Sequence, residues 1–349
     1  MKTYFLQVKE VKKETEDTVT ISFWHPISEQ IKYKAGQFIT IAVPGADGKK
    51  VKRSYSMSSS PATDTAVAVT VKRVPNGVVS NYLNDNVHTG DFLEVIEPMG
   101  NFLFEPLEQP DRDIYLFGAG SGITPLISIA KTVLKTEAQT KVRIFYGNRS
   151  EDSIIFKQEL EELENQYKER LSIQYILSQP QGIWVGEKGR INQANATLWL
   201  KDSCADFAKD HFYMCGPEEM MDQIKRIFEL YEVPKAHVHF ERFNAPMQEE
   251  DTVNADELKK QTVKVLYDGD TYEFVVEPHQ TILEAALEQD IDLPYSCQAG
   301  MCTACLGKCT EGKVKMDEEE GLTEKEITQG YILTCVSHPM SEGVVVEIE

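Results

Sequence analysis

The stretch "PYSCQAGMCTACLGKC", residues 294–309, holds four of the seven cysteines of this 349-residue chain. Cys297, Cys302 and Cys305 are spaced C-x4-C-x2-C, and 29 residues separate Cys305 from Cys335. Four thiolates are the ligand set of a 2Fe-2S cluster, because they ligate both irons and no other side chain offers comparable softness and charge. The spacing therefore predicts a cluster-binding loop with these four cysteines as ligands.

Other uses of the same cysteines fit the pattern less well. A zinc site would normally show two C-x2-C pairs or histidine ligands, and only one such pair is present. A four-iron run would need C-x2-C-x2-C-x3-C-P, but Thr310 stands where the proline belongs. Cys309 could replace Cys335 as the fourth ligand, yet "GKCTEG" resembles a strand leaving the loop, where a buried inert thiol is the ordinary explanation.

Composition indicates a multidomain globular protein, since the chain is 41% hydrophobic and 26% charged. Its first residues, "MKTYFLQVKEVKKETEDT", lack the apolar core of a secretory signal, and no apolar run approaches the roughly 18 residues that span a bilayer. We therefore expect a cytoplasmic protein without a membrane segment. Thiols stay reduced there, which favours a metal site over disulfides.

The formal net charge of -20 is concentrated in the C-terminal part of the chain. Residues 244–349 contain 23 acidic and 7 basic side chains. Such a surface repels nucleic acid and is attracted to a partner with a basic docking patch. A surface that is acidic only for solubility is the plain alternative.

The pattern of strands and helices predicts three domains and a linker. Residues 1–108 contain short strands separated by turns, which predicts an antiparallel β-barrel or sandwich; the strands are "TVTISFWHP", "QFITIAV", "RSYSMSSS", "AVAVTVKRV" and "DFLEVIEPMG". Residues 109–243 alternate strands with helices, which predicts a doubly wound parallel sheet. Residues 244–260 are polar and acidic and are interpreted as a linker.

Residues 261–349 predict a small α+β domain around the cysteine loop. "QTVKVLYDGDTYEFVVE" indicates a hairpin that turns at Asp-Gly. A helix should follow in "TILEAALEQDI", where Thr281 and Glu284 have capping-box spacing. We expect "YILTCVSHPM" and "GVVVEIE" to form the closing strands.

The stretch "YLFGAGSGITPL", residues 115–126, places a glycine-rich turn between a buried strand and a helix. Such a turn presents backbone N–H groups and a helix N-terminus to a pyrophosphate. Ile123 replaces the third glycine of the usual dinucleotide fingerprint, so a tight turn without a ligand remains an alternative. We expect Thr124 to cap the helix and Pro125 to lie in its first turn.

Two further segments contain candidate binding residues. "HFYMCG" places Cys215 at the carboxyl end of a strand, where open α/β sheets bind ligands, although a lone cysteine there is more often part of the packing. In "KRSYSMSSS", strand alternation puts Arg53 and Tyr55 on one face and Ser56 on the other. "NGVVSNYL" places Gly77 at a probable helix start, a second phosphate-binding geometry. For Arg53, Tyr55 and Ser56, the alternative is a strand that merely faces solvent.

In this order the motifs resemble the ferredoxin-NADP reductase family with a plant-type ferredoxin domain at the C-terminus. The resemblance covers nearly the whole chain through "RSYS", "GVVSNYL", "GAGSGITPL", "YGNRSEDSIIF", "CGPEEMM" and the cysteine spacing. With "ERFNAP" it is strongest to reductase components of phenylacetyl-CoA epoxidase complexes, and reductases of steroid and aromatic-ring oxygenases share the layout. It implies a β-barrel flavin domain, an α/β nucleotide domain and a β-grasp ferredoxin domain.

The resemblance also implies a function, and roles for individual residues. Electrons would pass from NADPH (or NADH) through FAD and the 2Fe-2S cluster to an oxygenase. Arg53 would bind flavin phosphates, Tyr55 would stack on the isoalloxazine ring and Ser56 would hydrogen-bond near N5. The FAD pyrophosphate would be bound by Gly77, Val78, Val79 and Ser80. The nicotinamide dinucleotide would be lined by Gly120, Gly122, Ile123, Thr124, Cys215, Gly216 and Pro217, with Ser56 and Cys215 orienting the reacting atoms.

Two departures from the family pattern affect these expectations. Plant ferredoxin reductases end in an aromatic residue over the flavin, and here Phe243, followed by the linker, is the candidate. The Ser-Arg pair that selects the 2'-phosphate appears as Ser178 and Gln179, which leaves Arg149 and Ser178 to bind it. A non-catalytic iron-sulfur sensor, or a reductase of a diffusible small molecule, remains an alternative function.

Overall fold

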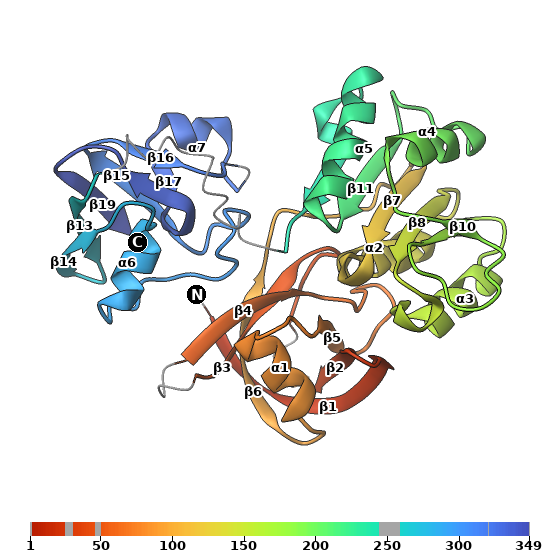
Figure 1. Cartoon of the computed structure of the whole chain (residues 1–349), viewed down its shortest axis with the longest axis horizontal. Coiled ribbons are helices and arrows are strands. Elements are labelled where there is room, and N and C mark those ends of the chain that lie inside the picture. The colour runs from red at the N-terminus through yellow and green to blue at the C-terminus, as the bar shows by residue number, and fades with distance from the viewer. Residues whose placement is uncertain (1, 25–30, 46–49, 244–258, 320, 349) are drawn as a thin grey trace. The chain divides into compact units, whose positions relative to one another are not determined.

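The computed structural model describes residues 2–24, 31–45, 50–243, 259–319 and 321–348. They form two compact units, of which one is Lys2–Arg242 and the other contains the described residues from Phe243 onward (Figure 1). All but the last two residues of the expected linker, 244–260, lie outside the described residues. None of the helices in the described ranges has the length and apolarity needed to cross a bilayer.

The first sheet of the larger unit is antiparallel, in the order β4-β3-β6-β1-β2-β5. A bridge between Met57 and Val69 joins the segment after β4 to β5, so the sheet closes on itself as the expected barrel. Its apolar interior includes Ile21, Phe23 and Ile41. The elements are β1 (Thr3–Thr15), β2 (Thr18–Trp24), β3 (Phe38–Pro44), β4 (Lys50–Ser56), β5 (Val67–Lys72), α1 (Val78–Asp85) and β6 (Phe92–Met99).

The longest strand of the barrel, β1, was not among the strands expected from the sequence. Leu6 and Val8 alternate toward the core, but the strand continues through the charged stretch "KEVKKET", in which only Val11 is apolar. It lies between β6 and β2 in the sheet, so cross-strand pairing rather than local hydrophobic alternation maintains it.

The second sheet of this unit is parallel throughout, in the order β10-β9-β8-β7-β11-β12. One core packs residues of α2 and α3 against the sheet, and another packs those of α4 and α5 against it, which confirms the doubly wound arrangement. The elements are β7 (Ile114–Ala119), α2 (Ile123–Thr136), β8 (Val142–Asn148), α3 (Lys157–Gln166), β9 (Leu171–Leu177), β10 (Glu187–Lys188), α4 (Gln193–Asp202), β11 (His211–Cys215), α5 (Glu218–Leu230) and β12 (Val238–Glu241).

In the smaller unit, a mixed sheet in the order β14-β13-β19-β15-β17 packs against α6. The parallel pair β13–β19 in the sheet is typical of a β-grasp domain. The expected hairpin turns at Asp268 and Gly269, which both have positive φ, and the Thr281–Glu284 capping box is present. The elements are β13 (Gln261–Tyr267), β14 (Asp270–Val276), α6 (Ile282–Glu288), β15 (Leu306–Glu311), β16 (Val314–Met316), α7 (Glu324–Thr328), β17 (Tyr331–Leu333), β18 (Ser337–Pro339) and β19 (Val344–Ile348).

The expectation of one closing strand in "YILTCVSHPM" is wrong. The segment divides into β17, a 3₁₀ turn (Thr334–Val336) and β18. The N–H and the hydroxyl of Thr334 both donate to the carbonyl of Cys305, at 3.1 and 3.2 Å. These contacts bend the chain where a strand would continue, and they bring Cys335 toward the cysteine loop.

A buried carboxylate holds the segment that connects the barrel to the parallel sheet. Glu137, 1% exposed, follows α2 and accepts hydrogen bonds from the Leu107 N–H at 2.9 Å and the Thr140 hydroxyl at 2.7 Å. Arg112, whose side chain is 10% exposed, pairs with the same carboxylate at 3.1 Å. The connecting segment is thereby tied to the nucleotide domain.

We predict that Glu137→Ala lowers the free energy of unfolding of the larger unit by about 3 kcal/mol, because the Arg112 charge remains buried without its partner. All three tryptophans, Trp24, Trp184 and Trp199, lie in this unit, so their emission during urea unfolding reports on it alone. Asp111→Asn is the control, since it breaks an exposed ion pair with Lys209 and should cost less than about 1 kcal/mol. Equal effects of the two changes would contradict the prediction.

Candidate functional site

The four cysteines expected to ligate the cluster converge in the smaller unit. Cys302, Cys305 and Cys335 are buried and Cys297 is partly exposed. The thiol of Cys305 donates to the sulfur of Cys335 at 3.2 Å, although the two residues belong to different segments. The thiols of Cys302 and Cys335 are close enough to Cys297 to lower its pKa. The structure therefore brings together the whole predicted set.

The environment of the cysteine loop favours a thiolate at Cys297, whereas interactions with Cys297 and burial raise the pKa of Cys302 and Cys335 well above the usual value. Hydrogen bonds from the thiols of Cys302 and Cys335, together with the backbone N–H groups of Ala299 and Met301, lower the pKa of Cys297 against the effect of burial. The Ala299 N–H lies 3.4 Å from the Cys297 sulfur. Backbone donors of this kind stabilise negative charge on sulfur, so the loop fits a cluster ligated by thiolates.

The four thiols match the number of ligands that a 2Fe-2S cluster requires, because its four thiolates are divided between two irons. Among the described residues, no set of three or more His, Cys, Asp or Glu side chains is placed to hold a single metal ion.

Cys309 lies away from this group. It belongs to β15, as the sequence indicated, and its thiol donates to the carbonyl of Glu311 at 3.3 Å. The thiol is only partly buried, and this burial raises its pKa. Nothing in these contacts makes Cys309 a competitor of Cys335.

We predict that Cys302→Ser and Cys335→Ser abolish cluster binding, because each removes one of four thiolates and leaves an iron under-ligated. Cys309→Ser should retain the cluster and serves as the matched control. Iron and acid-labile sulfide per chain, with the visible spectrum of the purified protein, measure the result. A Cys335→Ser protein with a full cluster, or a Cys309→Ser protein without one, would refute the ligand set.

The nucleotide candidates lie at the carboxyl ends of β7 and β11, which are parallel neighbours with Gly118 opposite Cys215. A Cβ built on Gly122 would lie 1.9 Å from the Cys215 carbonyl oxygen, so only glycine allows this approach. Gly120 has φ +54° and would have no atom within 4 Å of an added Cβ. The turn is thus packed against Cys215–Gly216 on one side and open at Gly120, which fits a dinucleotide cradle.

The start of α2 differs from the expectation in one detail. The helix begins at Ile123 with Gly122 as its N-cap, and no side chain caps it. Thr124 is therefore the second helical residue, and its hydroxyl donates to the Ser121 carbonyl at 3.0 Å. Pro125 lies in the first turn as expected. The first N–H groups of the helix have no side-chain cap, which suits the binding of an anionic group.

Cys215 is fully buried, and burial raises the pKa of its thiol well above the usual value. A neutral thiol can orient a neighbouring group but is a poor nucleophile. Pro217 follows as the N-cap of α5. Cys215, Gly216 and Pro217 therefore form a strand-to-helix connection next to the glycine turn.

Arg149 and Ser178 lie at neighbouring strand ends. Arg149 follows β8, Ser178 follows β9, and the Ser178 N–H donates to the Asn148 carbonyl at 2.9 Å. The structure therefore brings the two expected 2'-phosphate residues to the same edge of the sheet. Sequence reasoning missed Glu151 here, whose carboxylate accepts from the Gln181 N–H at 3.1 Å. The sequence carries no local signal for this contact, because Gln181 lies 30 residues further along the chain.

The flavin candidates lie on β4, where Tyr55 pairs with Ile39 of β3. Ser56 is 5% exposed, Arg53 is exposed, and Ser54 and Tyr55 are both partly buried, so burial does not alternate along this end of β4. Burial raises the pKa of the Tyr55 phenol, and the charge of Arg53 opposes the shift. The phenol therefore stays neutral, as a stacking ring should.

The second part of the flavin candidate site is the start of α1, which packs against β4 and β5. Gly77 is its N-cap, with no side-chain cap, and an added Cβ would lie 2.6 Å from the Ser80 hydroxyl oxygen. That hydroxyl accepts from the Val74 N–H at 3.1 Å, which fixes the turn. Val78 and Val79 begin the helix, so their N–H groups are available to a phosphate.

Contacts between side chains join the two halves of the larger unit near these sites. The Ser60 hydroxyl lies 2.7 Å from that of Thr132, and Ser128 donates to the Ser59 carbonyl at 2.6 Å. The 3₁₀ turn Gly120–Gly122 also contacts β5. The segment after the flavin strand is therefore held against α2, next to the nucleotide turn.

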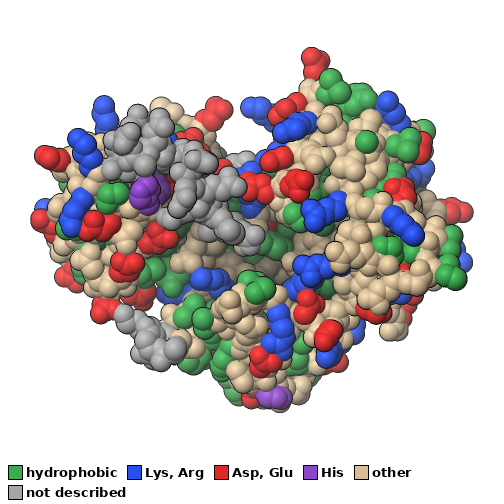
Figure 2. Space-filling view, viewed as in Figure 1, with side chains coloured by type: hydrophobic (Ala, Val, Ile, Leu, Met, Phe, Trp, Pro, Cys, Tyr) green, Lys and Arg blue, Asp and Glu red, His purple; other side chains and the backbone are tan. Residues whose placement is uncertain are grey.

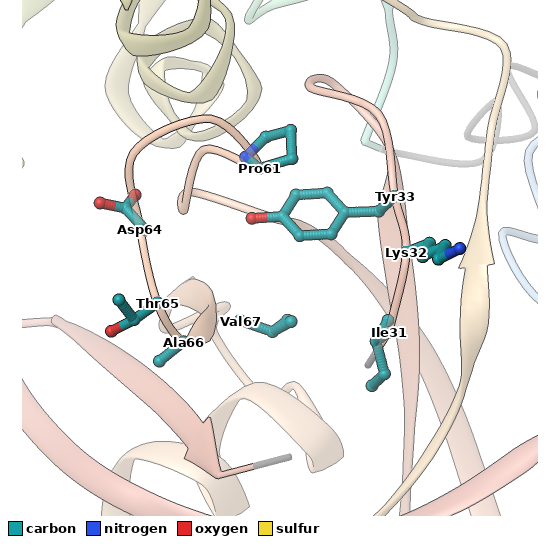
Figure 3. A pocket seen from close by; sticks show the side chains of 8 residues that line it. All are labelled: Ile31, Lys32, Tyr33, Pro61, Asp64, Thr65, Ala66 and Val67. Atoms are coloured by element: carbon teal, nitrogen blue, oxygen red, sulfur yellow. The ribbon is translucent and has the colours of Figure 1, made fainter. Parts of the chain in front are cut away.

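A cavity of about 420 Å³ opens on the barrel beside this junction. Figure 3 shows Tyr33 extending toward the loop with Pro61 and Asp64, and its hydroxyl lies 2.7 Å from that of Ser59. None of the expected site residues lines the cavity. Its lining residues are Ile31, Lys32, Tyr33, Pro61, Asp64, Thr65, Ala66 and Val67.

Gly122→Ala should weaken NADPH binding by at least about tenfold, because the added methyl group forces the turn away from the Cys215 carbonyl at a cost of about 1–3 kcal/mol. Gly147→Ala is the matched control at the same sheet edge, since its Cβ would meet the nearest atom at 3.5 Å. Equilibrium titration with NADPH gives the dissociation constants, and the flavin and iron contents should not change. Unaltered binding by Gly122→Ala would contradict this view of the turn.

Comparison with known proteins agrees with this division of sites. Residues 5–104 match the oxidoreductase FAD-binding domain, residues 116–226 the oxidoreductase NAD-binding domain, and residues 265–340 the 2Fe-2S iron-sulfur cluster binding domain. The ferredoxin reductase component of 3-ketosteroid-9-alpha-monooxygenase from Rhodococcus rhodochrous is 37% identical over 99% of this chain and 97% of that protein. The chain belongs to the ferredoxin reductase components of oxygenase systems.

Two further relatives support this assignment. A 1,2-phenylacetyl-CoA epoxidase component from Escherichia coli is 34% identical over 99% of this chain and 97% of that protein. The structure of phthalate dioxygenase reductase is similar with a TM-score of 0.64 and 25% identity over 99% of this chain and 98% of that one. The expected fold, the oxidoreductase activity, and the FAD, NAD and 2Fe-2S cofactors of this reductase are thus confirmed.

Proposed function

We propose that this reductase carries electrons from NADPH (or NADH) through FAD and a 2Fe-2S cluster to an oxygenase component. The observation that carries the proposal is the presence, in one chain, of a nucleotide turn closed by Gly122 against Cys215 and a loop with four convergent thiols. A nicotinamide donates two electrons as a hydride, whereas a cluster accepts one electron at a time. A bound flavin can exchange electrons in either way and can therefore connect the two. The protein contributes binding and orientation.

The individual roles follow from the positions of the residues. We assign the FAD phosphates to Arg53 and to the start of α1 from Gly77 to Ser80, and the flavin ring to Tyr55 and Ser56. We assign the dinucleotide to the turn from Gly120 to Thr124 and to Cys215–Pro217. Buried and neutral, Cys215 together with Ser56 would orient the reacting groups without moving a proton. We assign iron to Cys297, Cys302, Cys305 and Cys335.

We take the flavin domain as residues 1–108, the nucleotide domain as 109–243, the linker as 244–260 and the ferredoxin domain as 261–349. For the 2'-phosphate we assign Arg149 and Ser178, which favours NADPH, while the carboxylate of Glu151 at the same edge favours a free ribose hydroxyl. We also propose a cytoplasmic location, because four thiols can ligate iron only while they remain reduced.

The ferredoxin domain is the part we expect to contact the oxygenase. Figure 2 shows Asp and Glu side chains spread over the visible face of this unit. Residues 261–349 contain 18 acidic and 5 basic side chains, so a basic patch on the oxygenase would attract this domain electrostatically. Rising salt should weaken such an encounter, and the same charge disfavours binding to nucleic acid.

Two oxygenase systems are supported by relatives of this chain. A phenylacetyl-CoA epoxidase is our first candidate, and the 37% identity to a steroid monooxygenase reductase supports the second. The two candidates can be distinguished by adding the purified reductase to extracts of host cells that lack it. NADPH consumption that depends on phenylacetyl-CoA supports the first, and consumption that depends on a 3-ketosteroid supports the second.

We predict that Cys302→Ser separates the two halves of electron transfer. Reduction of ferricyanide by NADPH should persist, because the flavin and nucleotide sites are unchanged. Reduction of cytochrome c, used as a one-electron protein acceptor, should fall by at least about tenfold, because the one-electron outlet is lost. Initial rates at saturating NADPH measure both. Cys309→Ser should behave like the wild type, and undiminished cytochrome c reduction by Cys302→Ser would refute the proposed electron path.

A further inference from the structure

His338 is a buried histidine that the electron-transfer proposal does not use. It lies on β18, is 5% exposed, and follows Cys335 by three residues. Its Nδ1 lies 2.9 Å from the Gln280 carbonyl oxygen, and its Nε2 lies 2.8 Å from Oδ2 of Asp317. A carbonyl oxygen can only accept a hydrogen bond, and the same is true of an ionised carboxylate. With Asp317 ionised, both ring nitrogens donate, which requires the ring to be an imidazolium.

The charges around this ring agree with that state. Burial disfavours the charged form of His338, but the hydrogen bond and the charge of Asp317, the Gln280 carbonyl and the charge of Glu284 together raise its pKa. Lys315 is the position opposite His338 in the β16–β18 ladder, and its side chain is exposed. In this ion pair the His338 side chain is 6% exposed and the Asp317 side chain is 28% exposed.

Both partners of the ring belong to segments that pack around the ligand cysteines. Gln280 directly precedes Thr281, the N-cap of α6, and α6 packs against the 3₁₀ turn that contains Cys335. The Asp317 N–H donates to the carbonyl of Val336, the residue after Cys335, at 2.9 Å. The ring therefore ties α6 and residue 317 together on either side of the Cys335 turn.

The segment after Asp317 continues onto the cysteine loop itself. Glu318 packs on Gly300, where an added Cβ would lie 2.9 Å from the Glu318 Cβ. The Gly321 N–H donates to the Gly300 carbonyl at 2.9 Å, and a Cβ on Gly321 would lie 3.2 Å from the Cys302 nitrogen. Through this segment His338 is connected to the loop that contains the other three thiols.

We propose that His338 and Asp317 are positioning residues that hold the Cys335 turn and the Cys297–Cys305 loop in their relative places, and thereby control cluster retention and reduction potential. The inference rests on the four-cysteine site proposed above. Groups that hydrogen-bond metal ligands change metal affinity by about 10- to 100-fold when removed. His338 and Asp317 act on the ligands through the Val336 carbonyl and the start of α6. The imidazolium, three residues along the chain from Cys335, also adds positive charge, which favours the reduced cluster.

The test uses the full chain with its cofactors. His338→Gln can satisfy only one of the two acceptors, and we expect the cluster absorbance to decay at least about tenfold faster in excess EDTA. Asp317→Asn keeps an acceptor and removes the charge, so its decay should be slower than that of His338→Gln but faster than wild type. An EPR-monitored redox titration, which reports the cluster separately from the flavin, should give a lower potential for His338→Gln.

Two control variants carry the same kinds of substitution at positions away from the Cys335 turn. His88→Gln alters an exposed histidine near Asp91, and Glu277→Gln alters an exposed carboxylate paired with Lys260 in the same unit as the cluster. Both should retain wild-type decay and potential. Wild-type decay and potential in His338→Gln would overturn the inference while leaving the proposed function intact.

The remaining outcomes also decide the question. If His338→Gln purifies without any cluster, Asp317→Asn becomes the deciding variant, and wild-type decay in that protein would overturn the inference. If the wild-type chain itself binds no cluster, the proposed function fails first. A shifted decay and potential in both variants, with both controls unchanged, would support the positioning role.

Discussion

The close approach of Gly122 to the Cys215 carbonyl is the constraint on which the nucleotide half of the protein depends. It requires β7 and β11 to be parallel neighbours, and it requires the chain to turn sharply after β7 without a side chain. Those two conditions place the start of α2 beside the connection to α5, so two strand ends and two helix starts meet at one edge. A dinucleotide bound there would contact backbone groups first, which is the ordinary use of such an edge.

The ferredoxin domain repeats this principle with a different ligand. Gly300 and Gly321 let two segments approach closely, and the thiols then converge from the loop and from the Cys335 turn. In both units the binding geometry is set by backbone packing, and the side chains that define the chemistry are placed by it. Because backbone packing places the binding groups, the residues around each site can be ordinary core residues.

Local sequence patterns predicted what they could encode and failed where structure depends on distant contacts. The Asp268–Gly269 hairpin and the Thr281 capping box were predicted because each is specified within a few residues. The strand β1 was missed because pairing with β2 maintains its charged half. The bend at Cys335 was missed because hydrogen bonds from Thr334 to Cys305, across 29 residues of sequence, produce it.

The candidate site shows the same division. Cysteine spacing identified four thiols that the structure brings together, since the ligands of a cluster leave a direct mark on the sequence. The tie between His338 and Asp317 left no such mark, because a histidine and an aspartate 21 residues apart form no recognisable motif. Glu151 was missed for a related reason, since its contact with Gln181 depends on the pairing of β8 with β9.

The acidity of the ferredoxin domain has a consequence for its own cluster. A surface with a large excess of carboxylates makes the addition of an electron to an anionic cluster less favourable, although solvent screens the more distant charges. Donors close to the sulfur atoms must therefore offset the field, and the Ala299 N–H at 3.4 Å from Cys297 is one of them. His338 is buried in the same domain and lies between Asp317 and the Gln280 carbonyl. The domain can thus be acidic on its surface while backbone donors inside it stabilise negative charge on sulfur.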